Sequence, residues 1–240
     1  MSERSEVPEG WEFVPLGDIA SPSKEKIEPS DNPNSKYIGL EHIESNKCRV
    51  IGNGLAGDTK STKALFQKGD LLYGKLRPYL NKVCIPDFEG VCSTDILVFK
   101  QSPHLNNHYL MWFLSTPDFV DYANNNSSGV QLPRISFQKL SGYHIPLPPL
   151  PEQHEIVRRV DALFALADKI EAEVAAAREK TEMMRQSILV QAFSGRLVPT
   201  EAELARQEGR EYEPASVLLE RIRSEKKEKT GRRGTQSTLV

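Results

Sequence analysis

Basic and hydroxyl-bearing residues are concentrated in one stretch of the chain, KSTKALFQKGDLLYGKLRPYLNK over residues 60–82. Within residues 56–82, six lysine and arginine residues stand against two acids. Lys75 and Arg77 follow a predicted strand and lie on a loop that Pro78 stiffens. Arginine can hold two acceptors on a guanine edge or clamp a phosphate, and lysine and hydroxyl groups suit backbone phosphates. These residue types indicate contact with a polyanion, although a solvated charged face would have a similar composition.

Two further segments place polar side chains on turns. SSGVQLPRIS (127–136) puts Gln131 and Arg134 on a loop shaped by glycine and proline, and Ser93 and Thr94 precede a predicted strand. Each segment could also be an ordinary turn whose side chains only satisfy local hydrogen bonds. The candidate DNA-contacting residues are Lys60, Ser61, Thr62, Lys63, Lys75, Arg77, Tyr79, Asn81, Lys82, Ser93, Thr94, Gln131 and Arg134.

Sequence motifs for catalysis are missing. The sequence has no G-x-x-x-x-G-K-[ST] phosphate loop for ATP hydrolysis and no [N/D]-P-P-[F/Y] tetrad of an adenine methyltransferase. Its one E-x-K triplet, at 225–227, lies far from any carboxylate pair that a nuclease would need. The five histidines are scattered and the three cysteines never form C-x-x-C. We expect no catalytic residue, metal site or disulfide framework.

The elements that hold these loops are predicted to be short strands followed by helices. Apolar runs bounded by turn residues predict buried strands at 36–40, 70–74, 82–86 and 95–99. Residues 104–125 predict a helix or a helix pair, with Pro117 at the start of the second turn. The chain up to residue 150 is therefore predicted to be a mixed α/β domain, and the fold class is α+β.

A proline-rich hinge, IPLPPLPEQ (145–153), predicts a long helix from about Pro151 to Gly195. Apolar residues recur in that helix in steps of four and three, which is typical of a coiled-coil seam. At 1.5 Å per residue the helix would be roughly 60 Å long, so it is expected to need a partner helix. The predicted seam residues are Ile156, Val160, Leu163, Ala167, Ile170, Val174, Ala177, Thr181, Met184 and Ile188.

The remaining residues, 196–240, are predicted to form two shorter helices at 200–207 and 214–229 and a disordered end at 231–240. Seven basic residues against two acids between 221 and 233 give a basic tail, which could bind DNA, a partner subunit or neither. No apolar run is long enough to span a membrane, and no secretory signal is visible. We therefore expect a cytoplasmic protein.

In this order, the motifs resemble the specificity (S) subunit of type I restriction-modification enzymes over residues 8–223. The matching segments are PEGW (8–11), LGDI (16–19), KYIGLEHI (36–43), FQKGDLLYGKLRPYLNKV (66–83), GVCSTDILVF (90–99), LPRISFQKLSGYHIPLPPLPEQHEIV (132–157) and AFSGRLVP (192–199). Any one segment would be weak evidence, whereas their combined order is specific.

The resemblance implies a non-catalytic subunit that reads double-stranded DNA through a target recognition domain. It would direct methyltransferase and motor-nuclease subunits to a bipartite site, and S-adenosylmethionine, ATP and Mg²⁺ would belong to those partners and not to this chain. Lys75 and Arg77 lie inside a matching segment, which favours phosphate or scaffold contacts for them. Residues 54–65 and 126–131 lie outside the matching segments and are better candidates for reading bases.

The usual subunit of this family contains two recognition domains and two long helices, whereas this sequence contains one of each. We therefore expect a half-size subunit that forms a homodimer through residues 152–193 and reads an inverted-repeat site. The alternatives are a truncated polypeptide, a half that pairs with a different S polypeptide, and a coiled-coil adaptor outside restriction-modification.

Overall fold

The computed structural model describes residues 7–235, with side chains as far as residue 227, and confirms the α+β class. The strands are β1 (Glu12–Pro15), β2 (Lys26–Ile27), β3 (Lys36–Ile38), β4 (Gly54–Leu55), β5 (Lys63–Phe66), β6 (Leu71–Gly74), β7 (Val83–Cys84), β8 (Gly90–Cys92), β9 (Ile96–Phe99) and β10 (His144–Leu147). The helices are α1 (Leu16–Ile19), α2 (Asn107–Leu114), α3 (Pro117–Asn125), α4 (Phe137–Leu140), α5 (Leu150–Phe193), α6 (Glu201–Glu208) and α7 (Ala215–Thr235).

A three-stranded antiparallel sheet, in the order β7-β6-β9, is buried on both faces. Successive side chains of a strand point to opposite faces, and β6 divides accordingly: Leu71 and Tyr73 join one apolar cluster and Leu72 joins the other. The same division holds in β7, where Val83 and Cys84 belong to different clusters. This two-sided burial explains why the predicted strands are apolar throughout and do not alternate with polar residues.

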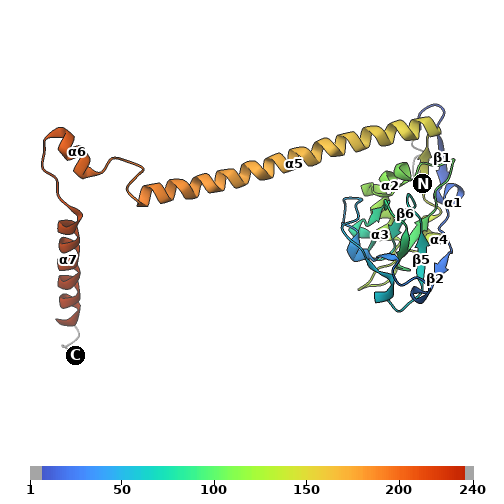
Figure 1. Cartoon of the computed structure of the whole chain (residues 1–240), viewed down its shortest axis with the longest axis horizontal. Coiled ribbons are helices and arrows are strands. Elements are labelled where there is room, and N and C mark those ends of the chain that lie inside the picture. The colour runs from blue at the N-terminus through green and yellow to red at the C-terminus, as the bar shows by residue number, and fades with distance from the viewer. Residues whose placement is uncertain (1–6, 236–240) are drawn as a thin grey trace. The chain divides into compact units, whose positions relative to one another are not determined.

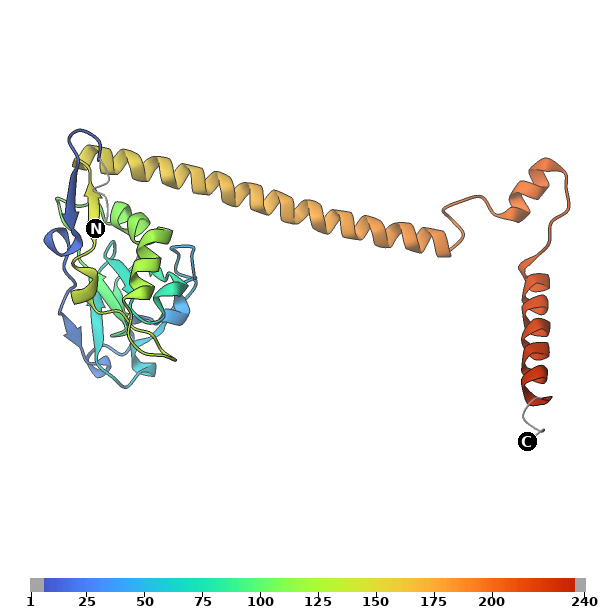
Figure 2. The ribbon, with the colours of Figure 1, turned by 180° about the vertical axis from the view of Figure 1, so that it is seen from behind.

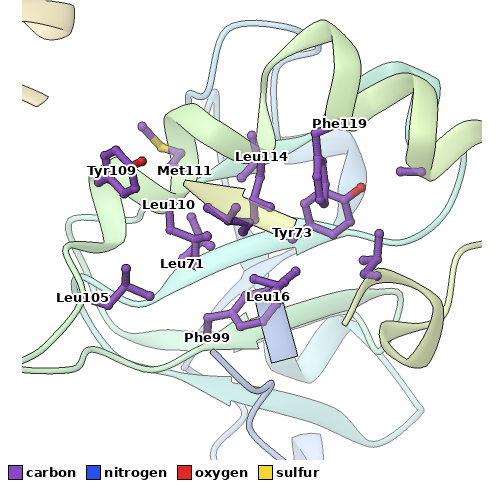
Figure 3. Packing of buried hydrophobic residues seen from close by; sticks show 14 of the residues in the cluster. Leu16, Leu71, Tyr73, Phe99, Leu105, Tyr109, Leu110, Met111, Leu114 and Phe119 are labelled. Atoms are coloured by element: carbon purple, nitrogen blue, oxygen red, sulfur yellow. The ribbon is translucent and has the colours of Figure 1, made fainter. Parts of the chain in front are cut away.

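Helices α2 and α3 cover one face of this sheet (Figure 1). The Asn106 side chain caps α2 by accepting hydrogen bonds from the amides of residues 108 and 109, and Pro117 begins α3, so the predicted helix pair is confirmed. Figure 3 shows Leu110 of α2 beside Leu71 and the rings of Tyr73 and Phe119 close to each other, in an edge-to-face arrangement. Burial of these side chains supplies the main stabilisation of the helical layer.

The other face packs against a five-stranded sheet in the order β2-β5-β8-β3-β4. Strands β3 and β8 pair in parallel, and the other neighbours are antiparallel. Ile38, Phe66 and Cys92 come from this sheet and pack with Leu72 of β6 in the second cluster. The N-terminal domain is therefore a helical layer on two packed sheets, and β1 and β10 form a further two-stranded antiparallel sheet.

The first turns of α5 belong to the same compact unit, which extends to Ala165. The Trp112 indole N–H donates to Asp161 Oδ1 at 2.9 Å, and its ring lies 4.8 Å from that of Phe164. Ile156 packs against the helical-layer core. The buried side-chain oxygen of Gln153, Oε1, accepts a hydrogen bond from the backbone N–H of Asn106 at 2.9 Å. The start of the helix is thus fixed on the domain by packing and by hydrogen bonds.

Helix α5 runs without interruption through 44 residues, a length of about 66 Å (Figure 1), and Figure 2 shows it unbroken from the opposite side. Gly195 follows its end with φ of 71°, the left-handed conformation that glycine commonly adopts after a helix. The two predicted C-terminal helices are present as α6 and α7. Helix α7 continues to Thr235, so it includes part of the segment predicted to be disordered; residues 236–240 lie outside the described residues. Within residues 7–235, no helix combines the length and the hydropathy required to cross a bilayer.

Candidate nucleic-acid interface

The loop between β6 and β7 has a fixed and unusual backbone. Arg77 and Asn81 both adopt left-handed conformations, with φ of 52° and 45°, at the two ends of a 3₁₀ turn that begins at Pro78. Such conformations are uncommon for residues other than glycine and persist only where the surrounding structure holds them. Here Asn81 Nδ2 donates to the Ser115 carbonyl at 3.1 Å, and the Arg77 amide donates to the Pro133 carbonyl at 2.6 Å. The Arg77 side chain itself is exposed.

The structure brings the three predicted polar segments together. The Lys75 amide donates to the Asp95 carbonyl at 2.8 Å, and the Ile135 amide donates to the Lys75 carbonyl at 3.0 Å. The loop 127–136 is closed by reciprocal backbone hydrogen bonds of 2.9 Å between Ser128 and Arg134. Segments that are separate in the sequence therefore form one continuous backbone-paired surface.

Two adjacent cavities open on this surface, with volumes of about 590 and 490 Å³. Lys75, Leu97, Arg134 and Phe137 line both of them. The first cavity is also lined by Ser21, Pro22, Ser23, Lys24, Glu25, Lys26, Ala64, Thr94, Asp95 and Ile96. The second is also lined by Ser128, Leu132, Ile135, Ser136 and Lys139.

Positive charge dominates the walls of these cavities. Burial lowers the pKa of Lys75, and the nearby charges of Arg134 and Lys26 lower it further, while Asp95 opposes both effects. This pattern places several cations close enough to disfavour one another. A polyanion bound here would relieve that repulsion, because each phosphate would neutralise one of the basic side chains.

Lys24, Lys26 and Lys139 are contributors that sequence reasoning missed. The two exposed N-terminal lysines lie near or on β2, a strand of two residues that is too short to show a periodic signal. Lys26 reaches the cavity because it pairs with Ala64 across antiparallel strands. Lys139 Nζ donates to the Asn126 carbonyl at 2.7 Å and thereby supports the loop 127–136.

Several predicted residues are engaged within the domain. Lys63 is only 4% exposed, and its Nζ donates to Ser61 Oγ at 2.8 Å. Lys82 Nζ donates to the Leu40 carbonyl at 2.6 Å, and Thr62 Oγ1 donates to a carboxylate oxygen of Glu28 at the same distance. These contacts assign the side chains to support of the scaffold.

The other predicted residues are distributed over the surface. Tyr79 is 48% exposed, and Gln131 lies exposed near the tip of its loop beside the fully exposed Val130. Thr94 lines the first cavity, whereas Ser93 accepts a hydrogen bond from the Asp95 amide at 3.2 Å. Lys60 is exposed and lines a separate cavity of about 330 Å³, so the structure does not bring it to the Lys75 surface.

Ligands for a metal ion do not gather in the part of the chain that the structure describes, where no group of three or more histidine, cysteine, aspartate or glutamate residues is found. Burial raises the pKa of the Cys84 and Cys92 thiols to about 12, so at neutral pH both are protonated and apolar. Their side chains fill the second core cluster.

A second surface is the apolar stripe of α5. Leu163, Ile170 and Met184 are 66%, 51% and 56% exposed, although such side chains are normally buried. Val174 and Ile188 on the same seam are similarly exposed, at 47% and 46%. A helix with a continuous exposed apolar stripe is typical of one that packs against another helix.

The chain thus combines a layered domain, whose basic loops surround two cavities, with a long helix that carries exposed apolar side chains. The family model described as type I restriction modification DNA specificity domain matches residues 8–177. The chain accordingly belongs to this family of specificity subunits, the non-catalytic part of type I restriction-modification enzymes. The resemblance seen in the sequence is confirmed.

Curated relatives and solved structures agree with this assignment. The chain is 36% identical to the type I restriction enzyme EcoDI specificity subunit of Escherichia coli, over 98% of this chain and 53% of that protein. It is 32% identical to the StySPI specificity subunit of Salmonella potsdam, over 90% of this chain and 50% of that protein. The chain spans about half the length of the curated relatives it matches.

The fold resembles chains in two solved structures of type I restriction-modification proteins. The crystal structure of the HsdS subunit from Thermoanaerobacter tengcongensis matches with a TM-score of 0.64 and 27% identity, over 78% of this chain and 50% of that chain. A structure concerned with complex assembly and conformational transition of the type I R-M system matches with a TM-score of 0.68 and 25% identity, over the same shares.

Proposed function

We propose that the chain reads a double-stranded DNA sequence for a type I restriction-modification system and acts in the cytoplasm. The observation that carries this proposal is the convergence of Lys75, Arg134 and Lys26 on one cavity, in a chain of the specificity family. Cations at the rim of a cavity suit phosphates, and fork-shaped donors suit base edges. The exposed Arg77 extends the same basic surface along the paired loops.

The chemistry of the system belongs to partners of this chain. A methyltransferase (M) subunit would modify adenine with S-adenosylmethionine, and a motor-nuclease (R) subunit would use ATP and Mg²⁺ to restrict unmodified DNA. This chain would select the DNA target site, and it would hold none of these cofactors itself.

The apolar stripe of α5 supports a second element of the proposal, a homodimer of half-subunits. Two copies would pair their helices along the seam from Leu163 to Ile188, whose exposed side chains are otherwise left in water. The related specificity subunits are about twice as long as this chain, so two copies would match one relative in length. Pairing with a different S half, or activity as a coiled-coil adaptor without DNA recognition, are the alternatives.

Base-resolved methylation sequencing of host DNA, with and without this gene, tests the proposal directly. Loss of one bipartite adenine motif on deletion is the expected result. A motif with two-fold symmetry supports the homodimer, because identical readers contact identical half-sites, and an asymmetric motif identifies a second, different half. An unchanged methylation pattern contradicts the proposed function.

Arg77→Ala is expected to weaken DNA binding by a similar factor on all sequences. The Arg77 side chain is exposed beside the paired loops, and loss of one phosphate contact reduces the slope of log K against log salt by about 0.9. The measurement is the affinity of the full chain for random-sequence duplex at several salt concentrations. Arg206→Ala, on α6, is the matched control and should leave the slope unchanged. A change in sequence preference would instead make Arg77 a base reader.

A further inference from the structure

The side chain of Arg134 is held by an acid that the sequence did not connect with it. Arg134 Nη2 lies 2.7 Å from Asp95 Oδ1 in an ion pair whose two side chains are 55% and 27% exposed. The main chain of Asp95 is fixed in turn, because its amide donates to Ser93 Oγ and its carbonyl accepts from the Lys75 amide. The backbone that carries the carboxylate is therefore held in place beside the guanidinium group.

The backbone of Arg134 is fixed as well. Both of its peptide groups pair with Ser128, each at 2.9 Å, across a turn in which Gly129 has φ of 106°. A β-carbon on Gly129 would lie 3.0 Å from the Leu132 carbonyl oxygen, so the turn is tight as well as left-handed. A fixed backbone and a fixed terminal group leave this long side chain with little rotamer freedom to lose on binding.

Charge distinguishes two uses of such an arginine. The affinity of an arginine for a phosphate depends on its net positive charge, and Asp95 offsets most of that charge at Arg134. The recognition of a base depends instead on the direction of the N–H donors, and the ion pair holds these donors in one orientation. The guanidinium has five N–H donors, and over half of the side chain is exposed, so donors remain for the two acceptors of a guanine edge.

Lysines around the same cavity suit the phosphates better. Lys24 and Lys26 are exposed and line the first cavity, whereas Lys139 of the second cavity is engaged with the Asn126 carbonyl. Arg134 lines both cavities and lies at their common wall. The arrangement places an oriented donor fork in a cavity that is also lined by lysines, which is the combination of contacts expected where a base edge lies between two phosphate strands.

We propose that Arg134, oriented by Asp95, reads a guanine base in the DNA target and is a specificity-determining residue of this chain. This inference rests on the proposed function and names one of its readers. It departs from the expectation that readers lie outside the matching segments, because Arg134 stands inside the segment 132–157, and the ion pair with Asp95 is the reason for the departure. Lys24 and Lys26 then hold flanking phosphates, and Asp95 is a positioning residue that acts through the arginine.

The test compares the full-length chain with its Arg134→Lys, Asp95→Asn and Lys26→Gln variants in selection from a pool of random-sequence DNA duplexes. Arg134→Lys keeps the charge and removes the fork. Asp95→Asn keeps the size of the side chain and adds one net positive charge. Lys26→Gln is the matched control, because it removes a cation from the same cavity without touching the ion pair. Circular dichroism verifies that all variants are folded.

The expected result is that Arg134→Lys and Asp95→Asn both relax the same guanine position in the selected motif. The preference for guanine over the other bases at that position should decrease by a factor of about 5 to about 100. Asp95→Asn should do so although its extra charge leaves binding to random DNA equal or tighter, and Lys26→Gln should weaken binding to all sequences alike.

Other outcomes overturn the inference. Uniform loss of affinity in Arg134→Lys would make the residue a phosphate contact, and an unchanged motif would remove it from the interface. Tighter binding by Asp95→Asn with the motif intact would show that the carboxylate only offsets charge. If the wild-type chain selects a motif and these variants keep it, the proposed function stands while the inference fails. A wild-type chain that selects no motif overturns both.

Discussion

Ile170→Asp is expected to convert a dimer of this chain into a monomer. Ile170 is 51% exposed on α5, and the proposed seam would bury this exposed part against a partner helix. Loss of that burial removes about 1 kcal/mol per protomer, and the new carboxylate must also be desolvated. A two-fold dimer carries the substitution twice, so the dissociation constant should rise by at least about 100-fold. Light scattering or sedimentation at micromolar concentration measures the mass directly.

Ala172→Asp provides the matched control for that experiment. Residue 172 is two positions along the same helix, which places its side chain on roughly the opposite face from Ile170. The control introduces the same charge and a larger loss of helix propensity, because alanine is a better helix former than isoleucine, but it leaves the seam apolar, and the dimer should persist. A dimer that survives Ile170→Asp would show that the exposed stripe is not the assembly surface.

The local pattern of the sequence predicted most elements of the fold. Apolar runs at 70–74 and 95–99 became β6 and β9, and the proline-free stretch after Pro151 became α5. The sequence predicted β6 as a buried strand, but it did not reveal which elements would cover its two faces, because those elements come from distant parts of the chain. Nor did it reveal the pairing of β1 with β10, which joins segments more than a hundred residues apart.

The candidate interface was predicted only in part, for a similar physical reason. Lys75 and Arg134 were both identified, each on its own loop, yet their proximity depends on pairing of the chain around residues 75–77 with 133–135. Asp95 was passed over because an isolated acid among basic loops has no local signal. It acquires a role only when the tertiary fold places it 2.7 Å from Arg134.

Burial of basic and amide side chains is another property that residue type alone does not predict. Lys63 and Asn81 stand in the same basic stretch as Lys75, and their residue types suit DNA contacts equally well. The fold turns Lys63 toward the Ser61 hydroxyl and leaves it 4% exposed, while Asn81 is 8% exposed at the end of a 3₁₀ turn. The exposed fraction of a side chain therefore distinguishes residues that support the fold from residues that could contact DNA. That fraction depends on strand pairing between distant parts of the chain.

Phe119→Ala is expected to destabilise the recognition domain by about 3–5 kcal/mol. Phe119 of α3 is completely buried, and its ring lies 5.9 Å from that of Tyr73 and 5.1 Å from that of Tyr143, nearly perpendicular to both. The alanine variant would lose these contacts and leave a cavity beneath α3, which leads directly into the loop 127–136. Urea denaturation followed by the fluorescence of Trp11 and Trp112 measures the free energy of unfolding.

Phe13→Ala removes the same atoms from the edge of the domain and provides the comparison. Phe13 on β1 is 41% exposed and stacks on His144 with ring centroids 5.3 Å apart, so its replacement should cost no more than about 1.5 kcal/mol. Equal losses in the two variants would contradict the assignment of Phe119 to the centre of the helical layer. Because a typical domain is stable by only about 5–15 kcal/mol, a loss of the expected size in Phe119→Ala removes much of that margin. The variant should then release the interface loop together with its supporting helix, so DNA binding and folding should fail at the same denaturant concentration.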